Sequence, residues 1–428
     1  MNRVLVVDKD KQPLMPCHPA RARALLRAGQ ARVLRRQPFT VMLTERAGGE
    51  TQTVQLKLDP GANTTGMALV GHFQRGQRVI WAAELTHRGF AISRRLARRA
   101  SQRRFRRSRH TRHRPARFLN RRRAPGWLPP SLQSRVQNIS TWVARLRRWS
   151  PITALALESV KFDTQALQDP EISGVEYQQG TVAGYEVRQY LVEKWGRKCA
   201  YCSRENSPLE IEHLVPRCRG GSHRVSNLTL ACRACNLDKG NRTAAEYGYP
   251  HLQAQAKAPL KDAAAVNATR WLLYERLLAT GLPLEAGSGG RTQFNRTQQG
   301  YPKAHWLDAA CVGVSGAHVY ADPHSSPLRI RASGRQRRQM TLVDRFGFPR
   351  THGKASRVVH GFQTGDLVRA VVPSGQRAGI HVGRVAVKAN GQFTIGHIPD
   401  ILWRHCRRLQ AADGYEYQAG GSAPSSVA

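Results

Sequence analysis

The sequence predicts a multidomain α/β protein, and three observations support this prediction. The chain has 428 residues, which at about 100–200 residues per domain is enough for two to four domains. Segments with the two-residue alternation of strands and segments with the period of amphipathic helices follow one another along much of its length. Two Cys-x-x-Cys pairs, separated by 29 residues, mark a small metal-dependent unit inside this series.

The charge of the chain indicates a polyanionic partner. Lys and Arg number 68 against 28 Asp and Glu, so the formal net charge is +40 and the isoelectric point is about 11.3. An enzyme that acts on neutral metabolites would not need so many positive charges that repel one another, so the charge argues against this class of enzyme. The sequence contains no run of 18 apolar residues, so we expect no membrane-spanning helix. The charged Asp8 comes too early in the chain to leave room for the apolar region of a signal peptide. Eight cysteines, four of them in the two pairs, favour a reducing, cytoplasmic compartment.

Two β-containing units are expected at the start of the chain. Residues 1–46 predict a strand, a basic helix and further strands at Val4–Val7, Pro19–Arg27 and Ala31–Leu43. After them Val54, Leu56 and Leu58 alternate with polar residues, so that Asp59 ends a strand on the opposite, polar face. A Pro-Gly turn follows, and Thr65–Val70 forms the second strand of a hairpin.

The middle and C-terminal parts alternate between helices and strands. Ser131 can cap a helix whose apolar residues run from Leu132 to Leu146, and the strand Ile152–Leu157 ends in Glu158. We further expect helices at Tyr177–Trp195 and Asn267–Leu278, a flexible junction at Gly287–Gly290, an all-β unit over 340–400 and a disordered tail over 411–428.

The paired cysteines have the spacing of a structural zinc site. They are Cys199, Cys202, Cys232 and Cys235. Each Cys-x-x-Cys forms a tight knuckle, and the gap between the pairs lets both knuckles converge on one tetrahedral ion. The alternatives are four unligated core cysteines or a redox pair, but a redox role needs a thioredoxin-like βαβ context that is missing here. We therefore expect one structural Zn²⁺.

The segment between and after these pairs resembles the HNH, or ββα-metal, nuclease motif. A Glu-His pair, a Gly-Gly turn, an Asn-Leu strand and a helix opened by Cys-x-x-Cys-Asn follow in order. In this chemistry His213 deprotonates the attacking water, and Glu212 and Asn236 hold one Mg²⁺ at the scissile phosphate. The family often has Asp and His at these two ligand positions. Asn227, by analogy with the family, stays in the fold and orients His213 through backbone contacts. The alternative is a zinc-ribbon binding module with an inactive histidine.

Three distant segments each offer a carboxylate. Asp59 and Glu158 end strands, and Asp308 follows His305 by three residues on one helix face. Two Mg²⁺ ions held by such a cluster would support in-line hydrolysis of a phosphodiester. Each segment alone is weak evidence, because such carboxylates are common on surfaces. Their order, with the HNH-like unit between the second and the third, resembles a RuvC-like RNase H fold that is split by insertions.

One segment carries much of the positive charge. Residues 88–123 hold 16 arginines and no Lys, Asp or Glu. A helix here would be cationic on all sides and should become ordered only when phosphates surround it. Arginine favours bidentate phosphate contacts and stacking on bases. The residues expected to bind nucleic acid are Arg94, Arg95, Arg98, Arg99, Arg103, Arg104, Arg106, Arg107 and Arg109. A solvated charge run or a nuclear-localisation-like tract is the alternative.

Taken together, these motifs give the whole chain a resemblance to IscB, a family of transposon-associated, RNA-guided nucleases related to the CRISPR single-effector nucleases. The matching segments are Pro13–Pro16, the arginine-rich stretch from His87 to Arg123, Trp127–Leu132, Lys303–Ala310, Arg345–Arg350 and Gly361–Asp366. The resemblance as a whole covers nearly the whole chain.

The resemblance implies a division of the chain and a role for each site. The implied parts are an N-terminal Pro-Leu-Met-Pro-type domain (1–50), RuvC-like segments (51–86, 125–192 and 257–325), an arginine-rich bridge helix (87–124), an HNH domain (193–256), a C-terminal mainly β domain (326–412) and a disordered tail (413–428). It implies that Asp59, Glu158, His305 and Asp308 form a RuvC site with two Mg²⁺ that cuts the displaced strand, while the HNH site cuts the paired strand. It also implies that the C-terminal domain binds the guide RNA and a short target-adjacent motif, and the arginines concerned are Arg337, Arg338, Arg345, Arg350 and Arg369.

The main hypothesis is therefore an RNA-guided, Mg²⁺-dependent DNA endonuclease. A bound noncoding RNA would pair with one strand of target double-stranded DNA, and both strands would be cut. We expect a monomeric protein of the prokaryotic cytosol with no membrane partner. Two alternatives stay open. A protein-guided homing or junction-resolving endonuclease would use the same sites without RNA, and a non-catalytic RNA- or DNA-binding protein would carry relic sites.

Overall fold

The computed structural model describes residues 3–108, 127–159, 191–192, 194–196, 198–205, 207–257, 261–322, 325–334, 344–345, 348–350 and 356–418. All statements below concern these residues. Several predictions lie outside this part of the chain: the roles of Arg109, Arg337 and Arg338, and most of the helix Tyr177–Trp195. The side chains of Arg106 and Arg107 are likewise outside it.

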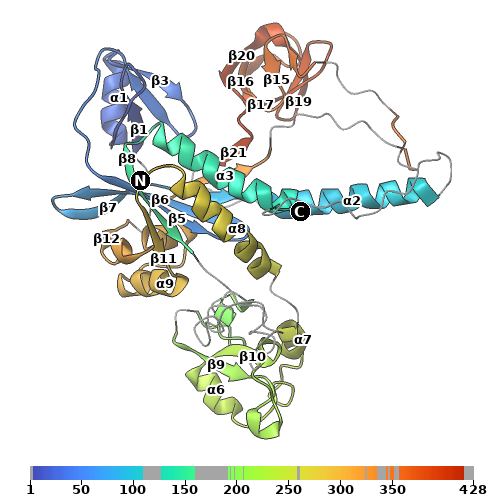
Figure 1. Ribbon diagram of the computed structural model, residues 1–428. Helices are drawn as coiled ribbons and strands as arrows, with labels where there is room; N and C mark the ends of the chain where they lie inside the picture. The colour runs from blue at the N-terminus through green and yellow to red at the C-terminus, as the bar shows by residue number, and fades with distance from the viewer. Residues whose placement is uncertain are drawn as a thin grey trace.

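An eight-stranded mixed sheet forms the centre of the molecule (Figure 1). Its strand order is β11-β8-β5-β6-β7-β13-β21, with the short β12 beside β7. The strands are β5 (Val54–Pro60), β6 (Thr64–Phe73), β7 (Gly76–Thr86), β8 (Ile152–Glu158), β11 (Leu284–Gly287), β12 (Val319–Tyr320), β13 (Leu328–Ala332) and β21 (Tyr415–Gln418). β5, β6 and β7 form an antiparallel meander, whereas β8 runs parallel to β5 and β11 runs parallel to β8.

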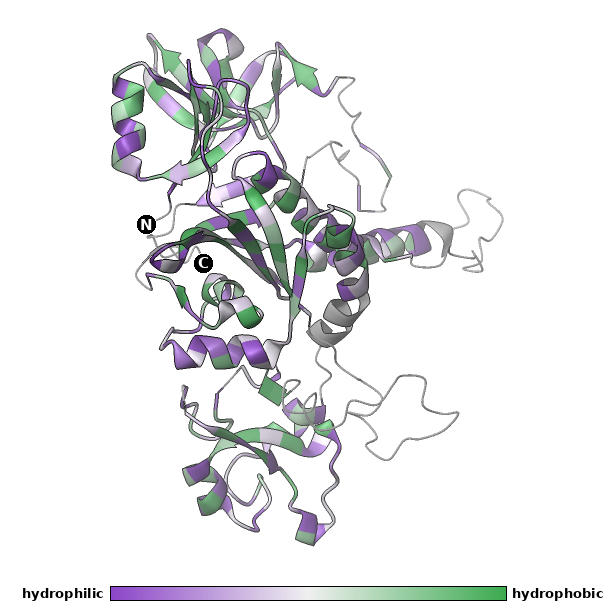
Figure 2. Ribbon diagram, turned by 60° about the vertical axis from the view of Figure 1, so that its left-hand side comes forward, coloured by the Kyte–Doolittle hydropathy of each residue, from purple (hydrophilic) through white to green (hydrophobic). Residues whose placement is uncertain are grey.

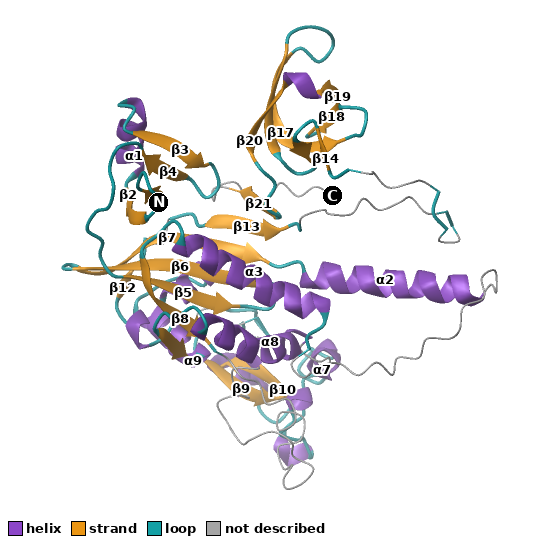
Figure 3. Ribbon diagram, turned by 45° about the horizontal axis from the view of Figure 1, so that its top comes forward, coloured by secondary structure: helices purple, strands orange, loops and turns teal. Residues whose placement is uncertain are grey.

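Helices cover both faces of this sheet. They are α3 (Pro130–Arg147), α8 (Lys261–Leu278), α9 (Gly289–Gln298) and α10 (His305–Ala310). α3 and α8 lie on one face (Figure 3), where Trp142 and Leu273 share an apolar core with Leu56. α10 packs on β5 and β6 from the other side, where Ala309 and Val70 belong to a second small core. The strands of the centre are therefore buried on both faces, as in α/β folds with two helical layers.

The polar face predicted for β5 is polar but not exposed. Gln55 is 6% exposed and Lys57 is fully buried. Strand alternation identified the direction of these side chains correctly. It could not show that a helical layer, contributed by residues more than two hundred positions later, covers them.

Most of the predicted elements are confirmed. The N-terminal unit is a four-stranded sheet of order β2-β1-β4-β3 with one helix. Its elements are β1 (Val4–Val7), β2 (Pro13–Cys17), α1 (Pro19–Arg27), β3 (Ala31–Arg35) and β4 (Thr40–Leu43). The hairpin of β5 and β6, the strand β8 and the helix α8 are also present where the sequence predicts them.

Two expectations are wrong: the cap of one helix and the flexibility of one junction. The N-cap of α3 is Pro129 and the helix begins at Pro130, so Ser131 lies inside the first turn and is not the cap. Proline suits a first helical position because the N–H that it lacks would be unpaired there. Ser288 caps α9 by accepting a hydrogen bond from the backbone N of Arg291 at 3.3 Å. The predicted flexible junction is therefore the end of β11 and an ordered helix start.

The predicted disordered tail also needs correction. β21 lies inside the residues 411–428 and pairs with β13, with Ala332 opposite Tyr415 and Arg329 opposite Gln418. The burial of Tyr415 and the packing of Tyr417 against the main core stabilise this strand. β13 itself belongs to the main sheet, although the family resemblance implied a C-terminal domain that begins at residue 326 and includes it.

Two smaller units extend from the sheet at opposite ends of the view in Figure 1. One contains β9 (Leu209–His213), β10 (Leu228–Cys232), α6 (Arg233–Lys239) and α7 (His251–Lys257), and has its own core. The other is a five-stranded sheet of β16 (Leu367–Val372), β17 (Gly379–Val387), β18 (Gln392–Ile395), β19 (Ile398–Leu402) and β20 (Cys406–Gln410), with the two-stranded β14 (Val358–Val359) and β15 (Phe362–Gln363) beside it. This confirms the all-β character predicted for 340–400 where the chain is described.

The described part of the arginine-rich segment forms a long projecting helix. α2 (Gly89–Ser108) extends from the sheet (Figure 1), and it is mostly hydrophilic in Figure 2. Every residue from 93 to 101 is exposed. Its base is anchored, because the buried His87 contacts the Oγ1 of Thr65 on β6 at 2.7 Å. Among the helices that the structure describes, none is long and apolar enough to cross a bilayer.

Asp413 ties the C-terminal strand to two other parts of the molecule. Arg35 at the end of β3 pairs with its Oδ2, and Arg145 of α3 does so at 3.2 Å. The hydroxyl of Tyr417 donates to the same carboxylate. The three charged side chains are at most 19% exposed. This cluster therefore joins the N-terminal unit, α3 and β21.

We expect Asp413→Ala to lower the free energy of unfolding by about 1–3 kcal/mol, because two guanidinium groups would lose their partner in a poorly hydrated place. Urea unfolding followed by tryptophan fluorescence measures this loss. Asp400→Asn is the control, because Asn removes the charge and tolerates the φ of 57° at this position: Asp400 also pairs with two cations, Lys388 and Arg377, but is 37% exposed. Its removal should cost about 0–1 kcal/mol, and equal losses for the two variants would contradict the role of Asp413.

Candidate functional site

The first candidate site lies where two neighbouring parallel strands end. Leu58 of β5 is directly opposite Leu157 of β8. The next residue of each strand is a carboxylate, so Asp59 and Glu158 end the two strands side by side. In α/β sheets ligands bind beyond the carboxyl ends of such strands. This pairing brings together residues that are about a hundred positions apart.

His305 reaches this site because α10 begins very close to β6. Gly66 lies opposite Asp59 in the sheet, and a Cβ at Gly66 would lie 1.8 Å from the backbone O of His305. Only glycine allows this approach. The Nδ1 of His305 lies 3.8 Å from the Oδ2 of Asp59, and the contact with this carboxylate raises the pKa of His305. The structure thus brings His305 to Asp59, and among the described residues no contact of Glu158 with either of these two is seen.

Asp308 follows one turn later and is held by two cations. Arg296 of α9 places its Nε 2.9 Å from the Oδ1 of Asp308, and Lys303 pairs with the Oδ2. Asp308 is 3% exposed, so these cations balance a nearly buried charge. Neither Arg296 nor Lys303 was predicted from the sequence as part of this site. Among the described residues, Asp59, Glu158, His305 and Asp308 do not form a cluster within reach of a single ion.

Arginines also stand beside the strand ends. A narrow pocket next to Glu158 is lined by Pro60, Arg135, Leu157, Thr269, Arg270 and Leu273. Arg135 of α3 is 3% exposed, and its Nη2 donates to the backbone O of Pro60 at 2.8 Å. It therefore fixes the turn that follows Asp59. Burial, with a smaller contribution from Arg135, lowers the pKa of His87 to about 3, so His87 is neutral at physiological pH.

A buried polar network supports the strand that carries Asp59. The Nζ of Lys57 donates to the backbone O of Val312 at 3.0 Å and to the Oγ of Ser315 at 2.6 Å. Ser315 also donates to Glu285 of β11, which accepts from Gln55 at 3.2 Å. Burial lowers the pKa of Lys57 to about 8. Burial alone would raise the pKa of Glu285, but the hydrogen bonds from Ser315 lower it. The network links β5, β11 and the segment after α10.

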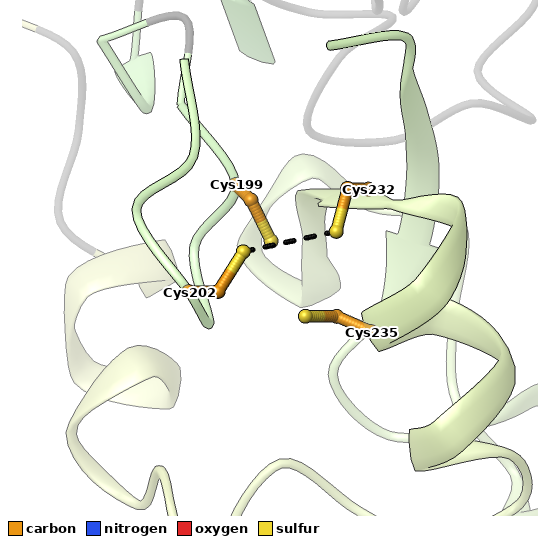
Figure 4. Close-up of side chains that lie close together, drawn as sticks. All are labelled: Cys199, Cys202, Cys232 and Cys235. Atoms are coloured by element: carbon orange, nitrogen blue, oxygen red, sulfur yellow. Dashed lines mark hydrogen bonds between the residues drawn. The ribbon is translucent and has the colours of Figure 1, made fainter.

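The four paired cysteines come together, as Figure 4 shows. Their sulfur atoms all lie within 4.8 Å of one another. The Sγ atoms of Cys202 and Cys232 are 3.7 Å apart, and sulfurs bound at about 2.3 Å around a tetrahedral zinc ion lie about 3.8 Å apart. A backbone hydrogen bond at Arg204 lowers the pKa of Cys202 to about 7, which favours the thiolate. The cluster is compatible with a structural zinc ion.

The second candidate site lies at the end of β9. The Nε2 of His213 is 3.2 Å from the Nδ1 of His223. Burial first, and then the nearby His223, lowers the pKa of His213. Asn227 is buried, and its side chain bonds the backbone N and O of Val215 at 2.9 and 3.0 Å. These bonds hold the chain two residues after His213.

Glu212 and Asn236 make no hydrogen bond with each other in the structure. Glu212 accepts from the hydroxyl of Tyr201 at 2.6 Å and pairs with Lys239 at 2.6 Å. Asn236 instead donates to the Oε2 of Glu210 at 2.7 Å. Glu210 and Glu212 are two residues apart and share one face of β9, which is why alternation alone could not separate them. Glu210 is a carboxylate that the sequence analysis missed.

The Gly-Gly turn of this unit has a steric cause. Gly220 has a φ of 81° and ends a short 3₁₀ turn. A Cβ at Gly221 would lie 1.7 Å from the backbone O of Val215 and 2.9 Å from the Nδ2 of Asn227. The two glycines therefore allow the loop to pack closely against the backbone of Val215 and the side chain of Asn227.

The predicted nucleic-acid contacts are exposed wherever the structure describes them. On α2 these are Arg94, Arg95, Arg98, Arg99, Arg103 and Arg104, and towards the C-terminus Arg345, Arg350 and Arg369. Exposure is what a phosphate contact requires, and the assignment of each arginine to a strand stays a prediction.

Comparison with known proteins shows that the unit containing the second site matches a protein family. Residues 199–242 match the model of the HNH endonuclease family, and residues 4–180 match a family described as RRXRR protein. Within the second range the chain has Arg-Arg-Phe-Arg-Arg at 103–107. The chain therefore carries an HNH endonuclease domain. HNH nucleases depend on a metal ion. No curated protein matches the chain at a significant level.

Among solved structures the chain is similar to Cas9 proteins. The match to Streptococcus thermophilus Cas9 in complex with the AGAA PAM has 12% identity and a TM-score of 0.22, and covers 60% of this chain and 32% of that one. The match to the type II-C Cas9 of Actinomyces naeslundii has 18% identity and a TM-score of 0.16, and covers 49% of this chain and 32% of that one. The chain thus spans about a third of the length of these proteins.

Gly66→Ala tests the approach of α10 to the sheet. We expect it to displace His305 and to lower the free energy of unfolding by about 1–3 kcal/mol or more, because the new methyl group overlaps backbone atoms. Hydrogen exchange of the α10 amides and thermal unfolding measure both effects. Gly89→Ala is the control, since its Cβ would meet the nearest atom, the O of Ser131, at 3.2 Å. Equal protection of α10 in both variants would refute this account.

Cys232→Ser tests the cysteine cluster. Zinc content should fall by about one equivalent per chain and the HNH unit should unfold locally, since metal binding and folding are coupled in small metal sites. Elemental analysis and limited proteolysis of residues 199–257 measure these effects. Cys218→Ser changes an exposed cysteine outside the cluster and should retain the metal. A wild-type chain that binds far less than one zinc ion would contradict the assignment.

Proposed function

We propose that the chain is an RNA-guided DNA endonuclease of the IscB type with two hydrolytic sites. The observation that carries this proposal is the placement of the HNH domain between β8 and β11 of the main sheet. The strands β5 and β8 of this sheet end side by side in Asp59 and Glu158. One chain therefore holds an HNH site and a separate pair of strand-end carboxylates.

The main sheet is proposed to be an RNase H-like, RuvC-type nuclease split into three segments. An antiparallel meander followed by parallel strands, with carboxylates at adjacent strand ends, supports this assignment. Asp59, Glu158, His305 and Asp308 offer the oxygen and imidazole ligands that hard divalent ions accept. Two bound Mg²⁺ would supply charge stabilisation for the attacking and leaving oxygens.

Lys303 gives this site a built-in counter-ion. It is 37% exposed, whereas the other partner of Asp308, Arg296, is only 8% exposed. A divalent ion at Asp308 would compete with Lys303, because the lysine can leave for solvent and Arg296 cannot. Arg296 then stays to hold the carboxylate in position.

In the HNH site His213 is proposed as the general base. Its lowered pKa keeps the imidazole neutral at physiological pH, so a ring nitrogen can accept a proton from water. Asn227 fixes the adjacent backbone, and Asn236 with Glu212 would hold one Mg²⁺. Glu210 contacts Asn236 and is a further candidate ligand. Lys239 donates to the backbone O of His213 at 3.0 Å and fixes the end of β9.

α2 is proposed to lie between two phosphate backbones. Six arginines with exposed side chains, Arg94, Arg95, Arg98, Arg99, Arg103 and Arg104, are spread over several sides of α2 at 3.6 residues per turn, so a single strand on one side would leave much of the charge without a partner. A guide RNA together with the DNA that it pairs with supplies phosphates on several sides. Binding should accordingly weaken steeply with salt.

Strand-resolved cleavage tests the two sites. On a duplex with differently labelled strands, Asp59→Ala should abolish cutting of the displaced strand only, and His213→Ala should abolish cutting of the paired strand only. Each loss should be on the order of a hundredfold or more, as for removal of a general base or a metal ligand. Arg23→Gln, an exposed change on α1, is the control.

The readout also distinguishes the alternatives. If both single variants lose both cuts while retaining zinc and wild-type thermal stability, the assignment of one site to each strand is wrong. If neither variant changes cleavage, the sites are relics, as the binding-protein alternative holds.

RNA guidance is tested by purification of the chain from cells that express the neighbouring noncoding RNA. We expect a defined RNA to copurify and to direct cutting to DNA that matches its guide segment. Replacing the guide sequence should redirect the cut, with the original target as the control. RNA-free protein that cuts a fixed DNA sequence would instead support the protein-guided alternative.

A further inference from the structure

An arginine-lined pocket lies at the end of the main sheet remote from the carboxylates. It is formed at the tip of the β6–β7 hairpin, which projects from the sheet in Figure 1. Asp59 pairs with Gly66, and the hairpin turns only after Phe73. Seven residues of strand separate these points, so the pocket is roughly 20 Å from Asp59. None of the predicted functional residues lines it.

The pocket has a cationic and aromatic lining. Its residues are Arg3, Gln52, Phe73, Gln74, Arg75, Gly76, Gln77, Arg78 and Tyr320. Three carry a positive charge, three are glutamines that can donate and accept hydrogen bonds, two are aromatic, and none is acidic. The cavity volume is about 630 Å³, within the range of about 300–1,000 Å³ that is typical of ligand sites. It is open to solvent.

Four segments distant in sequence build this pocket, and backbone interactions hold three of them in place. The two-residue turn after Phe73 is closed by Gly76, whose φ of 103° favours glycine. The parallel pairing of β12 with β7 sets Tyr320 opposite Arg78. The backbone N of Arg3 donates to the O of Ile80 at 3.0 Å and attaches the N-terminal segment to β7.

Arg78 and Tyr320 form a pair suited to a nucleotide. The guanidinium carbon of Arg78 lies 4.8 Å from the ring centroid of Tyr320, and Tyr320 is 57% exposed. An exposed tyrosine offers a surface on which a base can stack, and neighbouring arginines bind the flanking phosphates. A duplex keeps its bases stacked inside and cannot use the ring in this way.

We propose that this pocket binds a single-stranded segment of nucleic acid, with one base on Tyr320 and phosphates at Arg75 and Arg78. The site is separate from both hydrolytic sites, so it would hold a strand without cutting it. The shared chemistry of phosphate and unpaired base fits RNA and DNA alike. The 2′-hydroxyl is present in RNA and absent from DNA, and the glutamine side chains that line the pocket can donate to it or accept from it.

Photocrosslinking of the full-length chain tests this proposal. The probes are single-stranded RNA of about ten nucleotides with 4-thiouridine, the same sequence as DNA with 4-thiothymidine, and the matching duplex. We expect crosslinked peptides that contain Tyr320 or Phe73 with a single strand and a several-fold lower yield with the duplex. A higher yield with RNA than with DNA would identify RNA as the natural strand.

Variants distinguish binding in the pocket from nonspecific binding by the positive charge of the whole protein. Tyr320→Leu should reduce crosslinking and single-strand affinity about tenfold, since stacking of one base supplies that order of affinity. Arg78→Gln should reduce affinity and lower the salt slope by about 0.7, as expected for one phosphate contact of a single strand. Arg23→Gln removes the same charge from α1 and should have neither effect.

Two results would overturn the proposal. One is crosslinking confined to α2 or to the C-terminal unit. The other is equal binding by the Tyr320→Leu, Arg78→Gln and Arg23→Gln variants. Because the readout is binding, failure here leaves the cleavage tests of the hydrolytic sites untouched, and a chain without cleavage activity could still show the pocket to be occupied.

Discussion

The parallel pairing of β5 with β8 is the constraint on which the candidate nuclease site depends. Both strands end at the same edge of the sheet, and only this register sets Asp59 beside Glu158. The third element, α10, reaches the edge because Gly66 has no side chain in its way. Backbone hydrogen bonds and one missing methyl group thus position side chains from three parts of the chain. A register shift of one residue would turn Asp59 to the other face of the sheet.

Charge balance inside the main sheet follows a consistent pattern. Two acids in and against the main sheet are held by cations or hydrogen bonds: the nearly buried Asp308 by Arg296 and Lys303, and the partly buried Glu285 by Ser315 and Gln55. This is required, because an isolated charge in a poorly hydrated interior is costly. The excess of arginine on the surface serves other partners. The chain therefore holds these two acids in well-defined surroundings, while the described arginines of α2 from Arg94 to Arg104 are exposed.

Local patterns in the sequence predicted much of this structure. The alternation of Val54, Leu56 and Leu58 located β5 and its carboxylate, and the cysteine spacing located the zinc-type cluster. Contacts made by distant residues could not be predicted in this way. No local signal shows that Arg35 pairs with Asp413, that Glu210 rather than Glu212 contacts Asn236, or that Tyr415 pairs with β13. The sequence shows a glycine at position 66. The reason why glycine is required there is the close approach of α10, a helix about 240 residues later in the chain.

The pairing of β13 with β21 has a consequence for the evolution of the chain. The C-terminal β unit leaves the main sheet after Ala332 and returns before Tyr415, and these two residues are direct neighbours in the sheet. Its points of exit and return are therefore as close as the two ends of a tight hairpin. Closing such a loop costs little more entropy for a long insertion than for a short one. The unit can be enlarged, shortened or exchanged between relatives while the sheet that holds the carboxylates keeps its full set of strands.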